Sequence, residues 1–267
     1  MWRREPRCSL RSRPRKPGVE TMAKLITLRD VYKIYGEGLE SEVRALDGVS
    51  LDIERGEFVA VVGQSGSGKS TMMNVLGCLD IPTRGEYLLD GTDVQELTDK
   101  ELSRIRNKQI GFIFQQYNLI QSLTVLENVE LPLIYQGINA DDRYDLAMEA
   151  LERVGLAGRV KHRPTEMSGG QQQRAAIARA IATKPPIIMA DEPTGALDSH
   201  TSREVLAMLQ KLHDAGNTVV LITHDNSIAV QAQRIIRLED GRVIYDGDAH
   251  APEAVVTPDM AGKEVAQ

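Results

Sequence analysis

The residues whose types and spacing could do chemistry begin with a glycine-rich segment. Residues 63–71 read Gly-Gln-Ser-Gly-Ser-Gly-Lys-Ser-Thr and follow the apolar run Phe58–Val62. Glycines let such a turn wrap a phosphate chain with several backbone N–H groups facing inward, and a following helix adds its positive N-terminal end. An incidental glycine-rich turn is the alternative, which the strand before the turn disfavours. We expect a phosphate cradle formed by Gly63, Gln64, Ser65, Gly66, Ser67, Gly68, Lys69, Ser70 and Thr71.

Within this cradle, two side chains have specific expected roles. Lys69 would reach the β- and γ-phosphates of a nucleotide, and the Ser70 hydroxyl would ligate Mg²⁺.

Two carboxylates follow a second apolar run. Ile187–Ala190 precedes Asp191 and Glu192. At a strand end beside a phosphate cradle, Asp191 would hold Mg²⁺ through water. Glu192 could orient and deprotonate the attacking water. Without the cradle, the same pair would equally well be solvated acids at the end of an ordinary strand.

A histidine occupies a similar position after a third apolar run. His224 follows Val219–Thr223, so it would lie at the carboxyl end of a strand, where α/β sheets bind ligands. A neutral imidazole there could contact the γ-phosphate and couple it to Glu192. By position alone, a surface or core histidine is the more frequent case. The remaining histidines fit that description better: His162, His200, His213 and His250.

Short apolar strands alternate with helical patterns along the chain. Phe58–Val62, Ile187–Ala190 and Val219–Ile222 are continuous apolar runs, typical of strands buried on both faces. Between the last two, apolar residues at helical spacing predict a helix with Ser199 or Asp198 as its cap and a stop at Gly216; they are Val205, Met208, Leu209 and Leu212. Strands that alternate with helices predict an α/β fold with a parallel sheet and right-handed crossovers.

The remaining segments suggest further parts. Residues 116–167 lack a strong strand pattern and predict a helical insertion. Strand-like residues around Asp90-Gly91 and Asp240-Gly241 predict antiparallel strands near 25–60 and 85–95 and a closing hairpin near 234–246. We expect a main domain over 23–246 and a loose tail over 247–267.

Composition and charge limit the possible partners. The 267 residues include 32 basic and 38 acidic side chains, but the first 21 residues carry seven basic and two acidic ones. The remainder therefore has 25 basic and 36 acidic residues, a net charge of −11, which argues against nucleic acid as a partner. The basic extension, residues 1–22, is either a disordered tail that could touch anionic lipid or a misassigned start, with translation beginning at Met22.

Two cysteines, Cys8 and Cys78, are too few for a disulfide framework or a zinc site and fit a reducing cytosol. No apolar run approaches the length of about 18 residues that a membrane helix needs. A role at a membrane would therefore require docking to another chain.

One further segment points to a family. Ser168-Gly-Gly-Gln-Gln-Gln-Arg174 resembles the signature of ATP-binding cassette (ABC) ATPases, and the resemblance covers about residues 24–245. It implies a P-loop NTPase (RecA-like) parallel-sheet core, an N-terminal antiparallel β subdomain and a helical subdomain. It also implies that ATP with Mg²⁺ is bound in an ATP-dependent homodimer. Signature residues of one subunit would contact the ATP of the other: Ser168, Gly169, Gly170 and Gln171.

The same resemblance assigns further residues. Tyr35 matches the aromatic residue that stacks on adenine, with Tyr32 as a competitor that suits the core better. Gln115 matches a glutamine that contacts Mg²⁺ and water and senses the membrane partner. Ala196–Asp198 matches the loop that crosses the dimer interface. Thr71 would contact the α-phosphate, and Met167 departs from the family's usual leucine by a volume-conserving swap.

A closer group is also suggested. Four segments resemble the MacB/LolD cassettes: Gly77–Asp80, Phe114–Leu119, Glu127–Pro132 and Ala190–Ser199. This implies an ATP-hydrolysing motor at the cytoplasmic face of the plasma membrane that drives a separate MacB/LolD/FtsX-type permease for export or efflux. The alternative is an FtsE-like ATPase that signals to cell-wall hydrolases through a membrane partner. A soluble repair or translation ATPase, or a P-loop kinase, fits less well.

Overall fold

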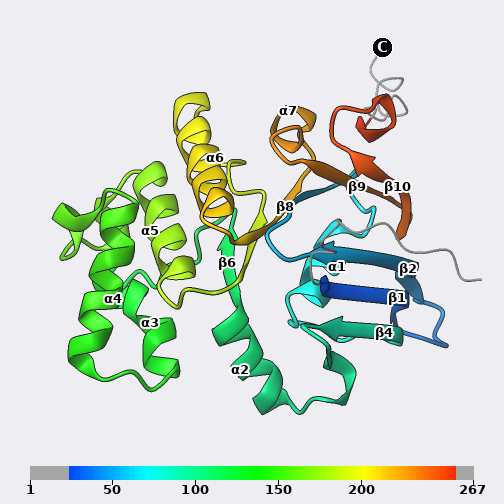
Figure 1. Ribbon diagram of the computed structural model, residues 1–267, viewed down its shortest axis with the longest axis horizontal. Helices are drawn as coiled ribbons and strands as arrows, with labels where there is room; N and C mark the ends of the chain where they lie inside the picture. Colours follow the sequence, from blue (N-terminus) through cyan, green and yellow to red (C-terminus); the bar gives the residue numbers. More distant parts are fainter. Residues whose placement is uncertain (1–23, 257–267) are drawn as a thin grey trace, which may run out of the picture.

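The computed structural model describes residues 24–256, so the predictions for residues 1–22 and for Cys8 lie outside the described residues. One sheet is antiparallel with the strand order β2-β1-β4-β5. Its strands are β1 (Lys24–Tyr35), β2 (Val43–Glu54), β4 (Arg84–Leu89) and β5 (Thr92–Asp93). This sheet is the predicted N-terminal antiparallel part, and Figure 1 shows α1 (Lys69–Leu76) beside its strands β1 and β2.

The second sheet has the strand order β10-β9-β3-β8-β7-β6. It consists of β3 (Phe58–Val62), β6 (Ile110–Phe114), β7 (Ile187–Asp191), β8 (Thr218–Thr223), β9 (Arg234–Glu239) and β10 (Arg242–Asp248). All neighbours from β9 to β6 pair in parallel, and β10 pairs with β9 as the predicted closing hairpin.

The central strands are apolar throughout because both of their faces are covered. In β3, Val59 and Val61 belong to the core under the antiparallel sheet, whereas Phe58, Ala60 and Val62 belong to the core on the opposite face. Side chains of a strand alternate between its two faces, so a strand between two cores needs apolar residues at every position. The carboxyl ends of these strands consequently meet at one edge of a rigid sheet.

Besides α5 (Gly169–Ile181), which packs on β6, further helices connect or cover this sheet. They are α1 (Lys69–Leu76), α2 (Asp99–Gln109), α6 (Ser199–Asp214) and α7 (Asn226–Ala229). The cap of α6 is Asp198, since its carboxylate accepts the backbone N–H groups of His200 and Thr201. The helix ends just before Gly216, whose φ of 97° suits glycine.

A helical lobe lies to one side of the sheet, shown in green in Figure 1. It contains α3 (Val125–Tyr135) and α4 (Ala140–Arg153) and packs against α5 (Gly169–Ile181). Ala147, Ala150, Leu151 and Val154 form the buried stripe of α4. The described structure has no strand in residues 116–167, the segment for which the sequence predicts a helical insertion.

The C-terminal segment differs from the prediction. β10 extends to Asp248, and residues 249–256 pack against the domain instead of forming a loose tail. The Asn226 side chain donates to the Val256 carbonyl and accepts the Val256 N–H, both at 2.9 Å. Ala254 and Val256 are buried. The Arg237 guanidinium also donates to the carbonyls of Glu253 and Val255, so distant side chains hold a segment that lacks helical or strand periodicity. Residues 257–267 lie outside the described residues.

Candidate nucleotide site

The glycine-rich segment forms a turn between β3 and α1. A Cβ on Gly63 would lie 2.4 Å from both the Leu238 carbonyl and the Ser67 Oγ, and Gly68 has a φ of 102°. Gly66 has a φ of 81° with open space where a side chain would be. The buried Ser67 Oγ finds no hydrogen-bond partner among the described residues. Side-chain-free backbone, an unpartnered hydroxyl and a helix N-terminus together fit a phosphate chain.

Lys69 reaches back across this turn. Its ammonium donates to the carbonyls of Gly63 at 2.8 Å and Gln64 at 2.7 Å. Burial lowers the pKa of Lys69, and the negative charges of Glu192 and Asp191 raise it in part. The cation is therefore aimed into the turn, where phosphate oxygens would be better acceptors than neutral carbonyls.

Three acceptors and donors gather at neighbouring strand ends. Asp191 ends β7, with Glu192 directly after it, and His224 follows β8, which lies between β7 and β3. Burial raises the pKa of Asp191, the charge of Glu192 raises it further, and Lys69 lowers it. A cation at this edge would offset the repulsion between the two carboxylates.

The Glu192 carboxylate is held in one orientation. Its Oε1 lies 2.6 Å from the His224 Nδ1 and accepts the His224 backbone N–H at 3.0 Å, and its Oε2 accepts the Thr223 hydroxyl at 3.2 Å. Glu192 itself has a φ of 46°, uncommon for a residue other than glycine. Its backbone N–H donates to the Ile222 carbonyl, which anchors the turn.

These residues surround a cavity of about 740 Å³. Its lining brings together nine of the residues that the sequence singled out: Gly63, Gln64, Ser65, Gly66, Lys69, Ser70, Asp191, Glu192 and His224. It also includes Ile222, Asn226 and Val256, which sequence reasoning missed. Asn226 lies two residues after His224 and could have been considered, whereas Val256 has no local signal because the fold brings it there from the C-terminal segment.

Other predicted residues lie outside this lining, namely Tyr35, Gln115 and the cradle residues Ser67, Gly68 and Thr71. Burial raises the pKa of the Tyr35 phenol, and hydrogen bonding with the Thr71 side chain partly offsets that rise, so Tyr35 lies beside the end of the cradle. The Tyr35 side chain is 41% exposed, whereas Tyr32 is half-buried. Gln115 follows Phe114, which pairs with Asp191, and its amide packs against Gly195.

The signature segment forms the N-terminus of α5 and is also outside the cavity lining. Ser168 is the N-cap, and its capping box with Gln171 satisfies the backbone N–H groups of both residues. A Cβ on Gly170 would lie 2.4 Å from the Thr201 methyl group, so glycine allows α5 and α6 to approach closely. The buried Gln173 amide donates to the Pro193 carbonyl at 2.7 Å, tying α5 to the turn after Glu192.

Comparison with known proteins identifies the family. Residues 46–195, more than half of the chain, match the model of the ABC transporter family. The chain is 54% identical over 222 residues to a macrolide export ATP-binding/permease protein, MacB, of Hyphomonas neptunium, covering 83% of this chain and 34% of that protein. An uncharacterized ABC transporter ATP-binding protein of Thermotoga maritima is 51% identical over 83% of this chain and 94% of its own length. The chain thus spans about a third of the length of the MacB-type relative.

Solved structures agree with this assignment. The ATP-binding cassette MJ0796, solved as a dimer in a post-hydrolysis state with ADP and phosphate, is 48% identical with a TM-score of 0.78. The match covers 85% of this chain and 99% of that one. ATP with Mg²⁺ is the nucleotide that this family binds and hydrolyses. The cradle, the carboxylates and these matches lead to one conclusion: the chain belongs to the ABC transporter family and is an ATP-binding cassette ATPase.

Proposed function

We propose that this cassette is the motor of an export transporter, in which two copies close around two ATP molecules. The observation that carries the proposal is the meeting of the cradle at Lys69 with Asp191, Glu192 and His224 around one cavity. Phosphate-binding backbone, a carboxylate for a metal and a second carboxylate for water are the parts that hydrolysis of ATP needs.

In this proposal, the cradle N–H groups and Lys69 hold the β- and γ-phosphates. The Ser70 hydroxyl and Asp191, with Gln115 from the end of β6, would hold Mg²⁺, because hard oxygen donors suit that ion. Mg²⁺ when bound neutralises charge on the phosphates. Thr71 would contact the α-phosphate, and Tyr35 would stack on adenine from the exposed side of the cradle.

Glu192 would act as the general base for the attacking water. Three donors from Thr223 and His224 fix its carboxylate, and a carboxylate has about four lone-pair sites, so one remains for water. His224 would hold Glu192 in place and contact the γ-phosphate. Its side chain is 69% exposed, so it can reach a ligand in the cavity without rearrangement of the sheet.

The signature residues would act on the ATP of a second copy. Ser168–Gln171 lie outside the lining of their own chain's cavity, and Ala196–Asp198 leads into α6, which packs on the signature helix. The dimeric MJ0796 cassette, with its high similarity over most of this chain, supports the same assembly here. ATP between the two copies would then complete each site.

A permease on a separate polypeptide is the proposed partner. The MacB relative joins ATP-binding and permease functions in its name. The Thermotoga maritima ATP-binding protein, which aligns over 94% of its length, supports a cassette encoded separately. None of the helices in residues 24–256 has the length and hydropathy to cross a bilayer. The cassette would thus sit at the cytoplasmic face of the plasma membrane through its permease.

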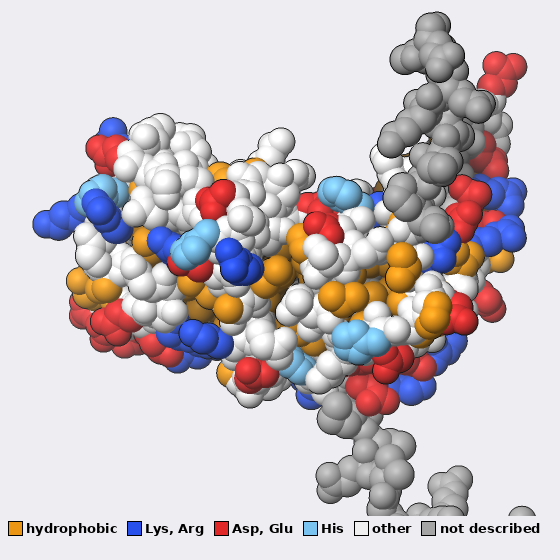
Figure 2. Space-filling model, turned by 90° about the horizontal axis from the view of Figure 1, so that it is seen from above, with side chains coloured by type: hydrophobic (Ala, Val, Ile, Leu, Met, Phe, Trp, Pro, Cys, Tyr) orange, Lys and Arg blue, Asp and Glu red, His pale blue; other side chains and the backbone are white. Residues whose placement is uncertain are grey.

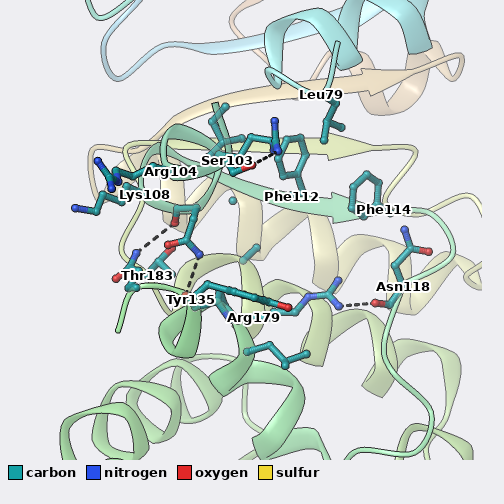
Figure 3. A pocket seen from close by; sticks show the side chains of 18 of the residues that line it. Leu79, Ser103, Arg104, Lys108, Phe112, Phe114, Asn118, Tyr135, Arg179 and Thr183 are labelled. Carbon is teal, nitrogen blue, oxygen red and sulfur yellow. Dashed lines mark hydrogen bonds between the residues drawn. The ribbon is translucent and has the colours of Figure 1, made fainter. Parts of the chain in front are cut away.

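A groove offers a place for that permease. It has a volume of about 1010 Å³ and lies where α2 and β6 face the helical lobe (Figure 3). Phe112 and Phe114 stack on its wall with ring centroids 5.6 Å apart, and Tyr135, 81% exposed, lies at its lobe side. The loop that begins with Gln115 follows directly from Phe114, so an element in this groove would contact the site through Gln115.

The deciding experiment is light scattering and phosphate release on Glu192→Gln with ATP, and with ATP plus EDTA. We expect hydrolysis to fall about 100- to 10,000-fold, as for loss of a general base, while ATP converts the monomer into a dimer. Glu239→Gln, at the end of β9 in the same sheet, is the matched control and should hydrolyse ATP at the parental rate. Parental hydrolysis by Glu192→Gln would refute its role as the base.

A further inference from the structure

The loop after Gln115 is fastened to the signature helix by one cation. The Arg179 guanidinium, near the C-terminal end of α5, donates to the carbonyls of Asn118 at 2.5 Å and Tyr117 at 2.8 Å. These bonds join residues more than 60 positions apart. Charge-assisted bonds from the planar guanidinium fork fix both the distance and the orientation of two adjacent peptide groups.

The backbone that Arg179 holds is strained. Tyr117 and Asn118 have φ values of 60° and 51°, so two consecutive residues other than glycine adopt the left-handed conformation. Asparagine tolerates this region, whereas a bulky tyrosine seldom occupies it. Such a conformation persists only where the surroundings hold it. In this conformation the carbonyls of Tyr117 and Asn118 both point to Arg179.

Arg179 has no other role in the described part of the chain. It forms no ion pair with a carboxylate among residues 24–256, and the two carbonyl bonds are its only hydrogen bonds there. Burial lowers the pKa of its guanidinium. A cation that is removed from water without a counterion destabilises the fold unless its N–H groups donate hydrogen bonds. The two bonds to the loop carbonyls are therefore the interaction that this buried guanidinium makes, which indicates a role in holding the loop.

The other end of this loop touches the catalytic side of the molecule. The Tyr117 hydroxyl lies over Gly169 of the signature, where a Cβ would come within 2.7 Å of it. The Gln115 amide lies equally close to the Cβ position of Gly195, in the turn after Glu192. The loop is therefore enclosed between α5 and the Glu192 turn, and a shift of Arg179 would displace Gln115.

We propose that Arg179 is a positioning residue that holds the Gln115–Asn118 loop to the signature helix and thereby sets the place of Gln115 during hydrolysis. Arg179 and Asn118 also line the groove that the permease would occupy, and Figure 3 shows the bond between them along its floor. An element seated in the groove would therefore press on the same bond that orients Gln115. The coupling between the groove and Gln115 rests on the proposed function. The effect of Gln115 on hydrolysis rests on the proposal that Gln115 contacts Mg²⁺ and the attacking water.

The test compares ATP binding and turnover of the full chain carrying Arg179→Ala. We expect KM for ATP to stay within about twofold and kcat to fall about 10- to 100-fold, since misplacement by about 1 Å costs rates of this order. Arg104→Ala is the matched control, because Arg104 lines the same groove but makes no bond to the loop; it should leave both constants unchanged. Parental kcat in a folded Arg179→Ala protein overturns the inference.

A second variant separates positioning from a general loss of structure. Asn118→Gly in the Arg179→Ala background should restore about half or more of the lost kcat on a logarithmic scale, because glycine adopts a positive φ without strain. A fall in kcat that Asn118→Gly does not restore, together with a raised KM, means a merely structural role and overturns the proposal. If Arg179→Ala does not fold, Arg179→Lys is the deciding variant. Lysine keeps the positive charge but lacks the planar guanidinium that donates to both carbonyls, so we expect kcat to fall while KM for ATP is unchanged. An inactive parent chain would instead refute the proposed function.

Discussion

The N-termini of α1 and α5 carry similar glycine-rich sequences but are built for different states. At α1, the N-cap is Gly68 in the left-handed conformation, and no side chain caps the helix. At α5, Ser168 caps the helix and forms a complete capping box with Gln171. The first terminus leaves its N–H groups available to a ligand, whereas at the second the capping box already satisfies the N–H groups of Ser168 and Gln171.

The two N-termini also differ in the residues that surround them. The cradle before α1 opens into a cavity that Asp191, Glu192 and His224 of the same chain complete. The signature has no such residues around it among those described, and Gly170 serves instead to pack α5 against Thr201. The comparison teaches that a glycine-rich helix start is not by itself a phosphate site. The groups that face a helix start decide whether it binds phosphate. For the signature, the facing group would be the ATP of a second copy.

The face in Figure 2 carries both charged and hydrophobic side chains. Acidic and basic side chains are interspersed over its rims, and hydrophobic side chains gather toward the middle.

Among changes at the two helix N-termini, the largest effect should come from the cradle before α1. Lys69→Ala is expected to weaken ATP binding about 10- to 100-fold, since a hydrogen bond to a charged group contributes about 1.5–3 kcal/mol. Calorimetric titration with ATP measures the change in the monomer. Lys184→Ala, which removes an exposed lysine paired with Glu149, should leave affinity unchanged. Equal affinity of the Lys69 variant would show that the cradle binds without its lysine.

A change at the signature should impair ATP-dependent dimerisation. Ser168→Ala should leave ATP binding to the monomer within about twofold, lower stability by about 1 kcal/mol through loss of the cap, and prevent the ATP-dependent dimer in the Glu192→Gln background. Light scattering reads out the dimer. Thr98→Ala removes the same kind of capping box at α2 and should cost similar stability without affecting dimerisation. A normal dimer with Ser168→Ala would contradict a role for the signature across subunits.

The smallest effect concerns the support of the signature by α6. Hydrogen bonds from the Thr201 backbone and side chain lower the pKa of Asp198 from 3.8 to about 2. Because the pKa is lower in the folded state, this stabilisation is complete above about pH 4 and is lost as the pH falls toward 2. An NMR titration of the Asp198 carboxyl should give a value near 2, and Asp198→Asn, which caps without titrating, is the control. An ordinary pKa would mean that the cap does not form in solution.

Motifs that act through neighbouring residues were predictable from sequence. The cradle and the strand ends at Asp191 and His224 depend on contacts within a few positions or on the rule that parallel strands end at one edge. The apolar runs of β3, β7 and β8 predicted burial on both faces because each position must face a core. The α/β fold and the ATPase assignment follow from these local patterns.

Contacts between distant segments were not predictable in this way. Residues 249–256 lack periodicity and are held by side chains from other segments, among them Asn226, which binds Val256 from 30 positions away, and Arg237. Likewise, no local sequence pattern around Arg179 or around the Gln115–Asn118 loop predicts the hydrogen bonds between them.

The sequence by itself predicted which residues bind phosphate, metal and water, because glycine, lysine and carboxylate chemistry is carried by short segments. Only the tertiary structure decided that Gly170 packs α5 against Thr201, and that Arg179 joins the groove to the signature helix. Both depend on which side chains pack against a helix end or a loop, and packing is set by the whole chain at once.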